Sequence, residues 1–261
     1  MKTYKKHSLA HAIAFAGALS IVAMPTYADT ILGIYAGAGA WNTDVDGDIN
    51  DDSNISTDQL GLDSSTNSFL YVALEHPVPF LPNVRLGVTD LAIDGSSIVN
   101  EPFTFQGETY DSNVSTRSEI DLSHTDLTFY YEILDNWVTL DLGFTARSFD
   151  GFASVSGNVD GGDDITGSID LDGTIPMVYG KAQLDLPFTG WHVAGTLNYI
   201  GYSDSKISDF EGKVGYQSNG LVFDVGVDIG YRTMNLDLQE SGDLNADVSV
   251  GGPFAAITVH F

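Results

Sequence analysis

The amino-acid sequence predicts an all-β protein, a closed antiparallel β-barrel that spans a membrane. Segments of alternating apolar and polar residues recur along the chain, their connections alternate between short and long, and the chain ends within such a segment. Alternation with a period of two gives a strand two different faces. Because membrane barrels of this kind usually have an even number of strands, we predict ten, with eight as the alternative.

The N-terminal stretch has the pattern of a secretory signal peptide. A basic start is followed by an apolar run from Leu9 to Met24 and by a small-x-Ala pattern that ends at Ala28. The run is too short for a membrane helix and leads into a cleavage pattern. We therefore predict a signal peptide over residues 1–28 and a barrel over residues 29–261.

Composition narrows the classes of function. Cysteine is absent, which excludes disulfides and thiolate metal sites. Three of the ten basic residues and none of the 36 acidic ones lie in the signal peptide, so the mature chain has seven basic residues, 36 acidic residues and a formal charge of −29. This charge argues against nucleic acid as a partner, because phosphates need a basic surface. It favours a solvated anionic exterior, and no cofactor is expected.

Ten segments carry strand-like alternation. They are residues 31–42, 68–77, 84–93, 119–133, 137–149, 174–186, 191–203, 208–217, 221–237 and 247–261. Turn-rich stretches near residues 76–83, 134–136, 187–190 and 217–220 connect some of them, and long loops over 43–67, 94–118 and 150–173 connect others. Short periplasmic turns and long, here acidic, extracellular loops are typical of membrane barrels.

The alternation also assigns faces. In residues 137–147 one face carries Val138, Leu140, Leu142, Phe144 and Ala146, and the other carries Thr139, Asp141, Gly143, Thr145 and Arg147. A soluble sandwich would turn the apolar face inward, whereas a membrane barrel turns it to lipid. Aromatic residues near segment ends favour the membrane barrel, as interfacial girdles: Trp41, Tyr130, Tyr131, Trp137, Trp191, Tyr216, Tyr231 and Phe261.

Charged residues recur on the face predicted to line the lumen. They are Glu75, Arg85, Asp126, Glu132, Asp141, Arg147, Lys181, Asp185, Glu211, Lys213, Asp224, Asp228 and Arg232. Side chains largely fill the interior of a small barrel, and charges confined there must pair. Two non-enzymatic interpretations follow: a structural plug of ion pairs, or a narrow, porin-like polar pore whose selectivity the pairs set.

Two alternatives come from other residues. His124 and Asp126 share a strand face and would suit a surface enzyme, a protease or a lipid-modifying enzyme, because a carboxylate can orient an imidazole. The acidic run from Asp44 to Asn50 would suit a cation-dependent adhesion or binding protein that holds divalent cations in its acidic loops. Its match to an EF-hand loop is poor, because Gly47 stands at the fourth position and Ile55 at the twelfth.

The two ends of the mature chain carry a resemblance. The first strand reads Ile31-Leu32-Gly33-Ile34-Tyr35-Ala36-Gly37-Ala38-Gly39-Ala40-Trp41, and the last reads Ala255-Ala256-Ile257-Thr258-Val259-His260-Phe261. Across its mature length the chain resembles small Gram-negative outer-membrane β-barrel proteins of unassigned activity. The resemblance implies the cell outer membrane, its lipid as surroundings, and the barrel-assembly machinery as a partner that reads Ile257, Val259 and Phe261. It implies no catalytic positions.

Overall fold

The computed structural model describes residues 32–50, 54–78, 80–158, 164–218, 220, 222–241 and 244–261. The predicted signal peptide lies outside these residues. Within them the regular structure consists of β-strands, without helices. No helix in this part of the chain is long and apolar enough to cross a membrane.

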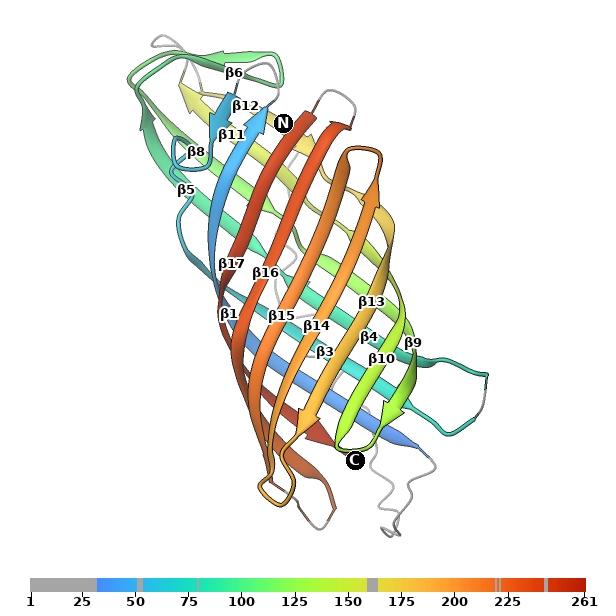
Figure 1. Cartoon of the computed structure of the whole chain (residues 1–261). Coiled ribbons are helices and arrows are strands. Elements are labelled where there is room, and N and C mark those ends of the chain that lie inside the picture. The colour runs from blue at the N-terminus through green and yellow to red at the C-terminus, as the bar shows by residue number, and fades with distance from the viewer. Residues whose placement is uncertain are drawn as a thin grey trace. The chain divides into compact units, whose positions relative to one another are not determined.

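Ten antiparallel strands close into a barrel (Figure 1). They are β1 (Gly33–Asn50), β3 (Ser65–Glu75), β4 (Asn83–Asp90), β9 (His124–Asp135), β10 (Val138–Phe149), β13 (Gly173–Asp185), β14 (Trp191–Tyr202), β15 (Ser205–Ser218), β16 (Asp224–Ser241) and β17 (Leu244–His260). Pairing of β17 with β1, from Tyr35↔His260 to Asn50↔Asn245, closes the ring. The prediction of ten strands is confirmed, and the alternative of eight is wrong.

The backbone of the last residue completes the seam. The Phe261 N–H donates to the Ile34 carbonyl at 2.9 Å, and the Ile34 N–H donates to the Phe261 carbonyl at 3.2 Å. Pairing along the seam is interrupted at Asn42 and Thr43, between Trp41↔Phe254 and Asp44↔Gly251, and the register is the same on both sides of this gap. Pro253, which lacks an N–H, lies opposite this gap.

The faces of the strands follow the predicted alternation. Leu142 and Phe144 on β10 and Ile229 on β16 are exposed, whereas Asp141 and Arg147 are buried in the lumen. A soluble sandwich would do the reverse, so that alternative is wrong. Most girdle aromatics are exposed as predicted. Two of them are buried, because their positions in the alternation place them on the lumen face of their strands.

Trp41 and Tyr130 point into the lumen and are 0 % and 3 % exposed. Trp41 is two residues from the lumen-facing Thr43 on β1 and so lies on the same face of the strand. Its Nε1–H donates to the Gly252 carbonyl at 3.2 Å. Tyr130 donates its hydroxyl to Glu75 at 2.7 Å. The girdle prediction is therefore wrong for these two residues, because alternation along the strand, and not position near a segment end, decides which face a side chain occupies.

The prediction of three long loops is also wrong. Where loops were expected, β1 continues to Asn50, and seven further strands occur: β2 (Asn54–Ser56), β5 (Ala92–Val99), β6 (Phe103–Phe105), β7 (Glu108–Tyr110), β8 (Val114–Asp121), β11 (Phe152–Asn158) and β12 (Asp164–Asp170). Four of them form a separate sheet in the order β12-β11-β8-β5, which we call the rim sheet. Its strands continue β13, β10, β9 and β4 beyond short breaks, so the sheet stands at the barrel end opposite the C-terminus (Figure 1).

An apolar core fills the space between the rim sheet and the barrel mouth. Its most deeply buried members include Trp41, Leu91, Ile93, Tyr110, Met177, Met234 and Val250. The β6–β7 hairpin covers the inner face of the rim sheet, where the Tyr110 hydroxyl donates to the Val155 carbonyl at 2.7 Å and accepts from the Gly167 N–H at 3.0 Å. One end of the barrel therefore holds a packed hydrophobic core.

Candidate functional site: the charged lumen

The predicted lumen charges fall into two groups at different depths. Toward the rim sheet, Asp126, Arg147 and Arg232 meet Asp209, a residue that the sequence analysis did not include; these four are called the arginine layer. Toward the C-terminus lie the other predicted charges, which are Glu75, Arg85, Glu132, Asp141, Lys181, Asp185, Glu211, Lys213, Asp224 and Asp228. Asp209 lies on the same face of β15 as Glu211 and Lys213, so the same alternation could have identified it as a lumen residue.

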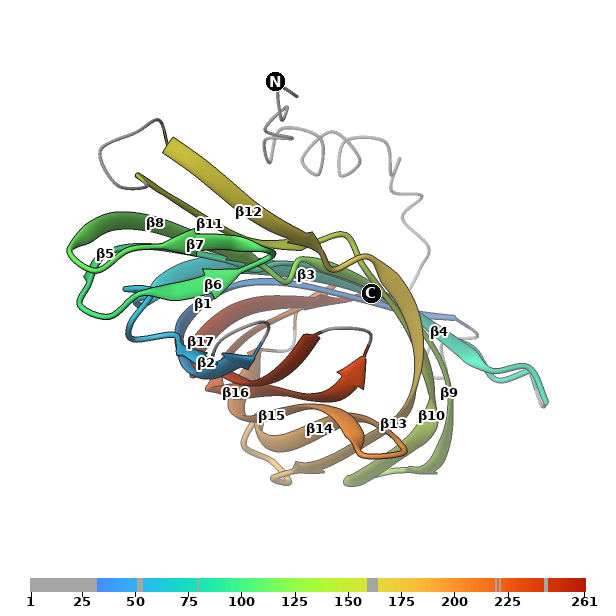
Figure 2. The ribbon, with the colours of Figure 1, turned by 90° about the horizontal axis from the view of Figure 1, so that it is seen from above.

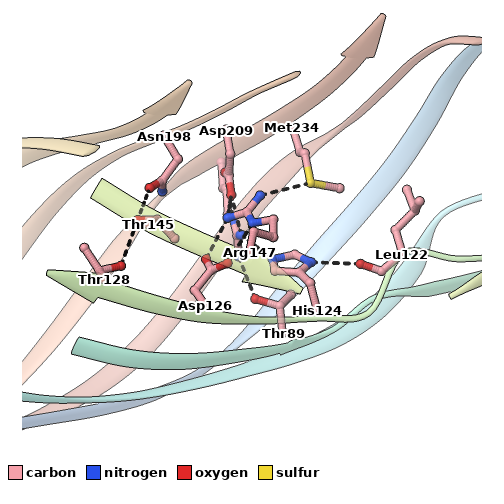
Figure 3. A network of polar contacts seen from close by, with 11 residues as sticks. Thr89, Leu122, His124, Asp126, Thr128, Thr145, Arg147, Asn198, Asp209 and Met234 are labelled. Atoms are coloured by element: carbon pink, nitrogen blue, oxygen red, sulfur yellow. Dashed lines mark hydrogen bonds and ion pairs between the residues drawn. The ribbon is translucent and has the colours of Figure 1, made fainter. Parts of the chain in front are cut away.

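Arg147 on β10 joins two carboxylates. Its Nε and Nη2 donate to Asp126 on β9 at 2.8 and 2.7 Å, and Nη2 also donates to Asp209 at 2.7 Å. Asp209 lies on β15, which is not a neighbour of β10, so the contact crosses the lumen. The Arg147 side chain is completely buried, and Figure 3 shows it between the two carboxylates.

Arg232 on β16 forms the second half of the layer. Its Nε and Nη2 donate to the two oxygens of Asp209 at 2.9 and 2.6 Å, and Nη1 donates to the Thr89 hydroxyl at 3.3 Å on the opposite wall. Its guanidinium carbon also lies 4.7 Å from the centre of the Trp41 ring. Two-point hydrogen bonds between guanidinium and carboxylate are short and directional. Two cations and two anions thus neutralise each other across the barrel.

The layer is in direct contact with the apolar core. Arg147 Nη1 lies 3.5 Å from the Met234 sulfur, and Met234 is fully buried in that core. Below the layer, Thr145 donates to Asn198 at 2.7 Å, and its hydroxyl also lies 2.8 Å from that of Thr128 (Figure 3). From the arginine layer up to the rim sheet, the lumen is therefore occupied by the ion pairs and by the apolar core.

His124 is fixed by its two ring nitrogens. Nδ1 lies 2.8 Å from the Leu122 carbonyl, and Nε2 lies 3.3 Å from Arg232 Nη2. Because a carbonyl only accepts and a guanidinium only donates, Nδ1 carries the proton and Nε2 accepts. The Asp126 carboxylate is engaged by Arg147, and the Ser123 hydroxyl accepts the Leu91 N–H at 3.0 Å. This geometry gives His124 a positioning contact with Arg232 and not the free base that the enzyme hypothesis needs.

A polar cavity of about 470 Å³ occupies the lumen nearer the C-terminus. Among the predicted charges it is lined by Glu75, Arg85, Glu132, Lys181, Asp185, Lys213, Asp224 and Asp228. Residues of the β9–β10 and β13–β14 turns, such as Asn136 and Gly190, also line it, so it opens at the turn end of the barrel. A smaller space of about 60 Å³ continues it as far as the arginine layer.

Charges in the cavity are paired in part. Lys213 lies 2.8 Å from Asp228 and 3.5 Å from Glu211, His192 lies 3.1 Å from Asp228, and Lys181 lies 3.5 Å from Asp141. Other carboxylates accept from neutral donors: Glu132 from Asn83, Asp185 from Gln183 and Asp224 from Gln217. Arg85 lies 4.0 Å from the centre of the Tyr71 ring. The structure thus brings the predicted charges into one lumen but not into one network.

The first part of the predicted acidic loop belongs to strand β1. Asp44, Asp46 and Asp48 alternate along β1 and are exposed, whereas Asp51 and Asp52 lie outside the described residues. Among the residues that the structure describes, no three His, Asp or Glu side chains gather in a way that could hold a metal ion. Binding of divalent cations by the remaining acidic residues stays a prediction.

Comparison with known proteins gives likeness at the level of fold. No protein-family model and no curated protein sequence matches the chain. Among solved structures it is similar to the attachment invasion locus protein Ail of Yersinia pestis, solved with the heparin analogue sucrose octasulfate (11 % identity over 89 % of this chain and 100 % of that chain, TM-score 0.36). It is also similar to the AIDA-I autotransporter transport unit of Escherichia coli (11 %, 96 % and 96 %, 0.37) and to the P. putida toluene transporter TodX (9 %, 87 % and 89 %, 0.33).

Proposed function

We propose that this protein is a non-enzymatic outer-membrane anchor whose lumen is closed and whose rim sheet is displayed at the cell surface. The arginine layer is the observation that carries the proposal. It joins β9, β10, β15 and β16 through Asp126, Arg147, Asp209 and Arg232, and the apolar core lies directly above it. A hydrated ion would have to displace buried ion pairs and then cross a packed hydrophobic region, and both steps are costly.

The apolar side chains on the outer wall of the barrel support the proposal that the protein lies in a lipid membrane. Exposed Leu, Val, Ile and Phe side chains cover the barrel, and Trp137 and Trp191 lie exposed near the short turns. Aromatic residues at this level are typical of a membrane interface. Short turns face the periplasm in barrels of this class, which would direct the rim sheet outward. The C-terminal strand would then be available to the assembly machinery in the periplasm.

Conductance tests the closed lumen. We expect the purified wild-type barrel, folded and inserted in a planar lipid bilayer, to show no steady single-channel current. Insertion is checked on the same sample by the change in electrophoretic mobility between heated and unheated protein. A large and steady current from the wild-type protein would contradict the plug and favour the narrow polar pore.

Deletion of Phe261 tests the predicted assembly signal. The deletion removes two seam hydrogen bonds with Ile34 and the ring that lies 5.8 Å from that of Phe223. We expect a lower yield of folded barrel in the outer membrane, while export to the periplasm continues. Phe261→Tyr keeps the backbone and an aromatic ring and serves as the control. Wild-type yield and heat-dependent mobility in the truncated protein would contradict the prediction.

A further inference from the structure

The two edges of the rim sheet differ. At one edge, Leu62 forms a β-bridge with Gly95 on β5, and the Gly61 carbonyl packs so closely that a side chain at Gly95 would collide with it. At the other edge, β12 pairs with β11 and with no other described strand. Figure 2 shows β12 as the outermost strand of the sheet. A free edge presents unpaired backbone donors and acceptors to a further strand.

The sequence of β12 leaves this edge open to pairing. It reads Asp-Ile-Thr-Gly-Ser-Ile-Asp from Asp164 to Asp170, without lysine or proline. Its register with β11 is continuous from Phe152↔Asp170 to Asn158↔Asp164, without a bulge. Charged residues, especially lysine, proline and bulges are common means of protecting an edge strand; β12 has only the two aspartates at its ends, which would repel anionic strands and attract cationic ones.

The side chains of β12 specify what a partner strand would need. Asp164, Thr166, Ser168 and Asp170 are exposed on the outer face, whereas Ile165 and Ile169 pack against the core on the inner face. A strand placed beside β12 sets its own side chains next to these in the same alternation. Cationic residues would meet the two aspartates, small polar residues would meet Thr166 and Ser168, and β-branched residues would extend the apolar inner face.

The charge of neighbouring strands reinforces this preference. On the outer face, Ser168 is in register with Ser154, which is in register with Glu119, and Glu119 with Asp94. Two carboxylates therefore lie on this face, on β8 and β5. The adjacent row from Thr166 through Ser156 reaches one cation, Arg117, so the face keeps a net negative charge. The mature chain as a whole carries −29, so long-range attraction also favours a cationic segment.

We infer that β12 binds an extended segment of another polypeptide as a fifth strand, with a lysine or arginine at each end and alternating β-branched and small polar residues between. This inference rests on the proposed display of the rim sheet at the cell surface. A second copy of this chain fits poorly, because antiparallel self-pairing centred on Gly167 would set Asp164 against Asp170 at both ends. Like charges directly opposite each other destabilise such pairs.

The test uses the full-length folded barrel in detergent micelles and a labelled seven-residue peptide, with lysine at both ends, threonine and serine at its third and fifth positions and valine elsewhere. We expect saturable binding by fluorescence anisotropy, and none for the same peptide with glutamate at both ends. In the Asp164→Lys, Asp170→Lys variant the lysine peptide should bind at least about tenfold more weakly, because two favourable cross-strand pairs become unfavourable. The glutamate peptide should then bind.

A matched control separates strand addition from general electrostatics. Asp44→Lys with Asp48→Lys makes the same change in charge on β1, which pairs with β17 at both positions and with β2 at Asp48, and should leave binding unchanged. Bound peptide should also slow amide hydrogen exchange in residues 164–170. Binding without this protection, equal binding of both peptides, or dimers that form through β12 would each overturn the inference. The conductance measurement tests the closed lumen separately. A barrel that conducts no current and does not bind the peptide would refute only the inference of a fifth strand.

Discussion

Replacement of Arg147 with alanine is expected to lower the free energy of unfolding by about 3–5 kcal/mol. The substitution leaves Asp126 without its only ion-pair partner among the described residues and removes one of the two cations that contact Asp209. Both carboxylates lie in a confined space beneath an apolar core, next to a cavity of only about 60 Å³, so water would replace the guanidinium incompletely. Urea unfolding of the barrel in lipid vesicles, followed by tryptophan fluorescence, measures the change.

Two further variants identify the cause. Lys206→Ala removes a cation from an exposed ion pair with Asp237 outside the lumen, and its unfolding midpoint should match that of the wild type. Arg147→Ala combined with Asp126→Ala restores the charge balance and should recover part of the lost stability, because the cost comes from the orphaned carboxylate. If Arg147→Ala alone unfolds like the wild type, water reaches the layer and the open-pore hypothesis gains support.

The alternation of residues was sufficient to predict the barrel. Lipid on one side and a polar lumen on the other impose a period of two on every membrane strand, so Leu142 and Asp141 could be assigned to faces without a structure. The same rule applied to β15 would have identified Asp209, and applied to β1 would have turned Trp41 inward. Trp41 and Asp209 both lie near the ends of their predicted segments, 31–42 and 208–217.

The rim sheet could not be predicted in the same way. Its strands are rich in serine, threonine, glycine and aspartate, residues that are also typical of loops. Their stability comes from tertiary contacts: Ile93, Ile120 and Val155 pack beneath a hairpin that contributes Phe105 and Tyr110. A contact between segments this distant in sequence leaves no local periodic signal. Pairing partners across the lumen, such as Arg147 with Asp209, were hidden for the same reason.

Leu142→Arg is expected to impair folding into lipid strongly. Leu142 lies near the middle of β10 with its side chain on the outer wall, where it is 49 % exposed and would contact acyl chains. An arginine on the lipid face costs about 2–4 kcal/mol near the bilayer midplane, because its charge loses water without gaining a partner. Vesicle unfolding of the wild type and the variant gives the difference.

Thr139→Arg is the matched control, because it places the same side chain on the same strand but in the polar cavity. Thr139 lines that cavity together with Glu132 and Asp135, so an arginine there meets carboxylates and water. We expect this variant to fold with a stability close to that of the wild type, while Leu142→Arg does not. If the order were reversed, Leu142 would face the interior of the protein and Thr139 its surroundings. The charged face would then be the outer one, and the closed lumen on which the membrane-anchor proposal depends would not exist.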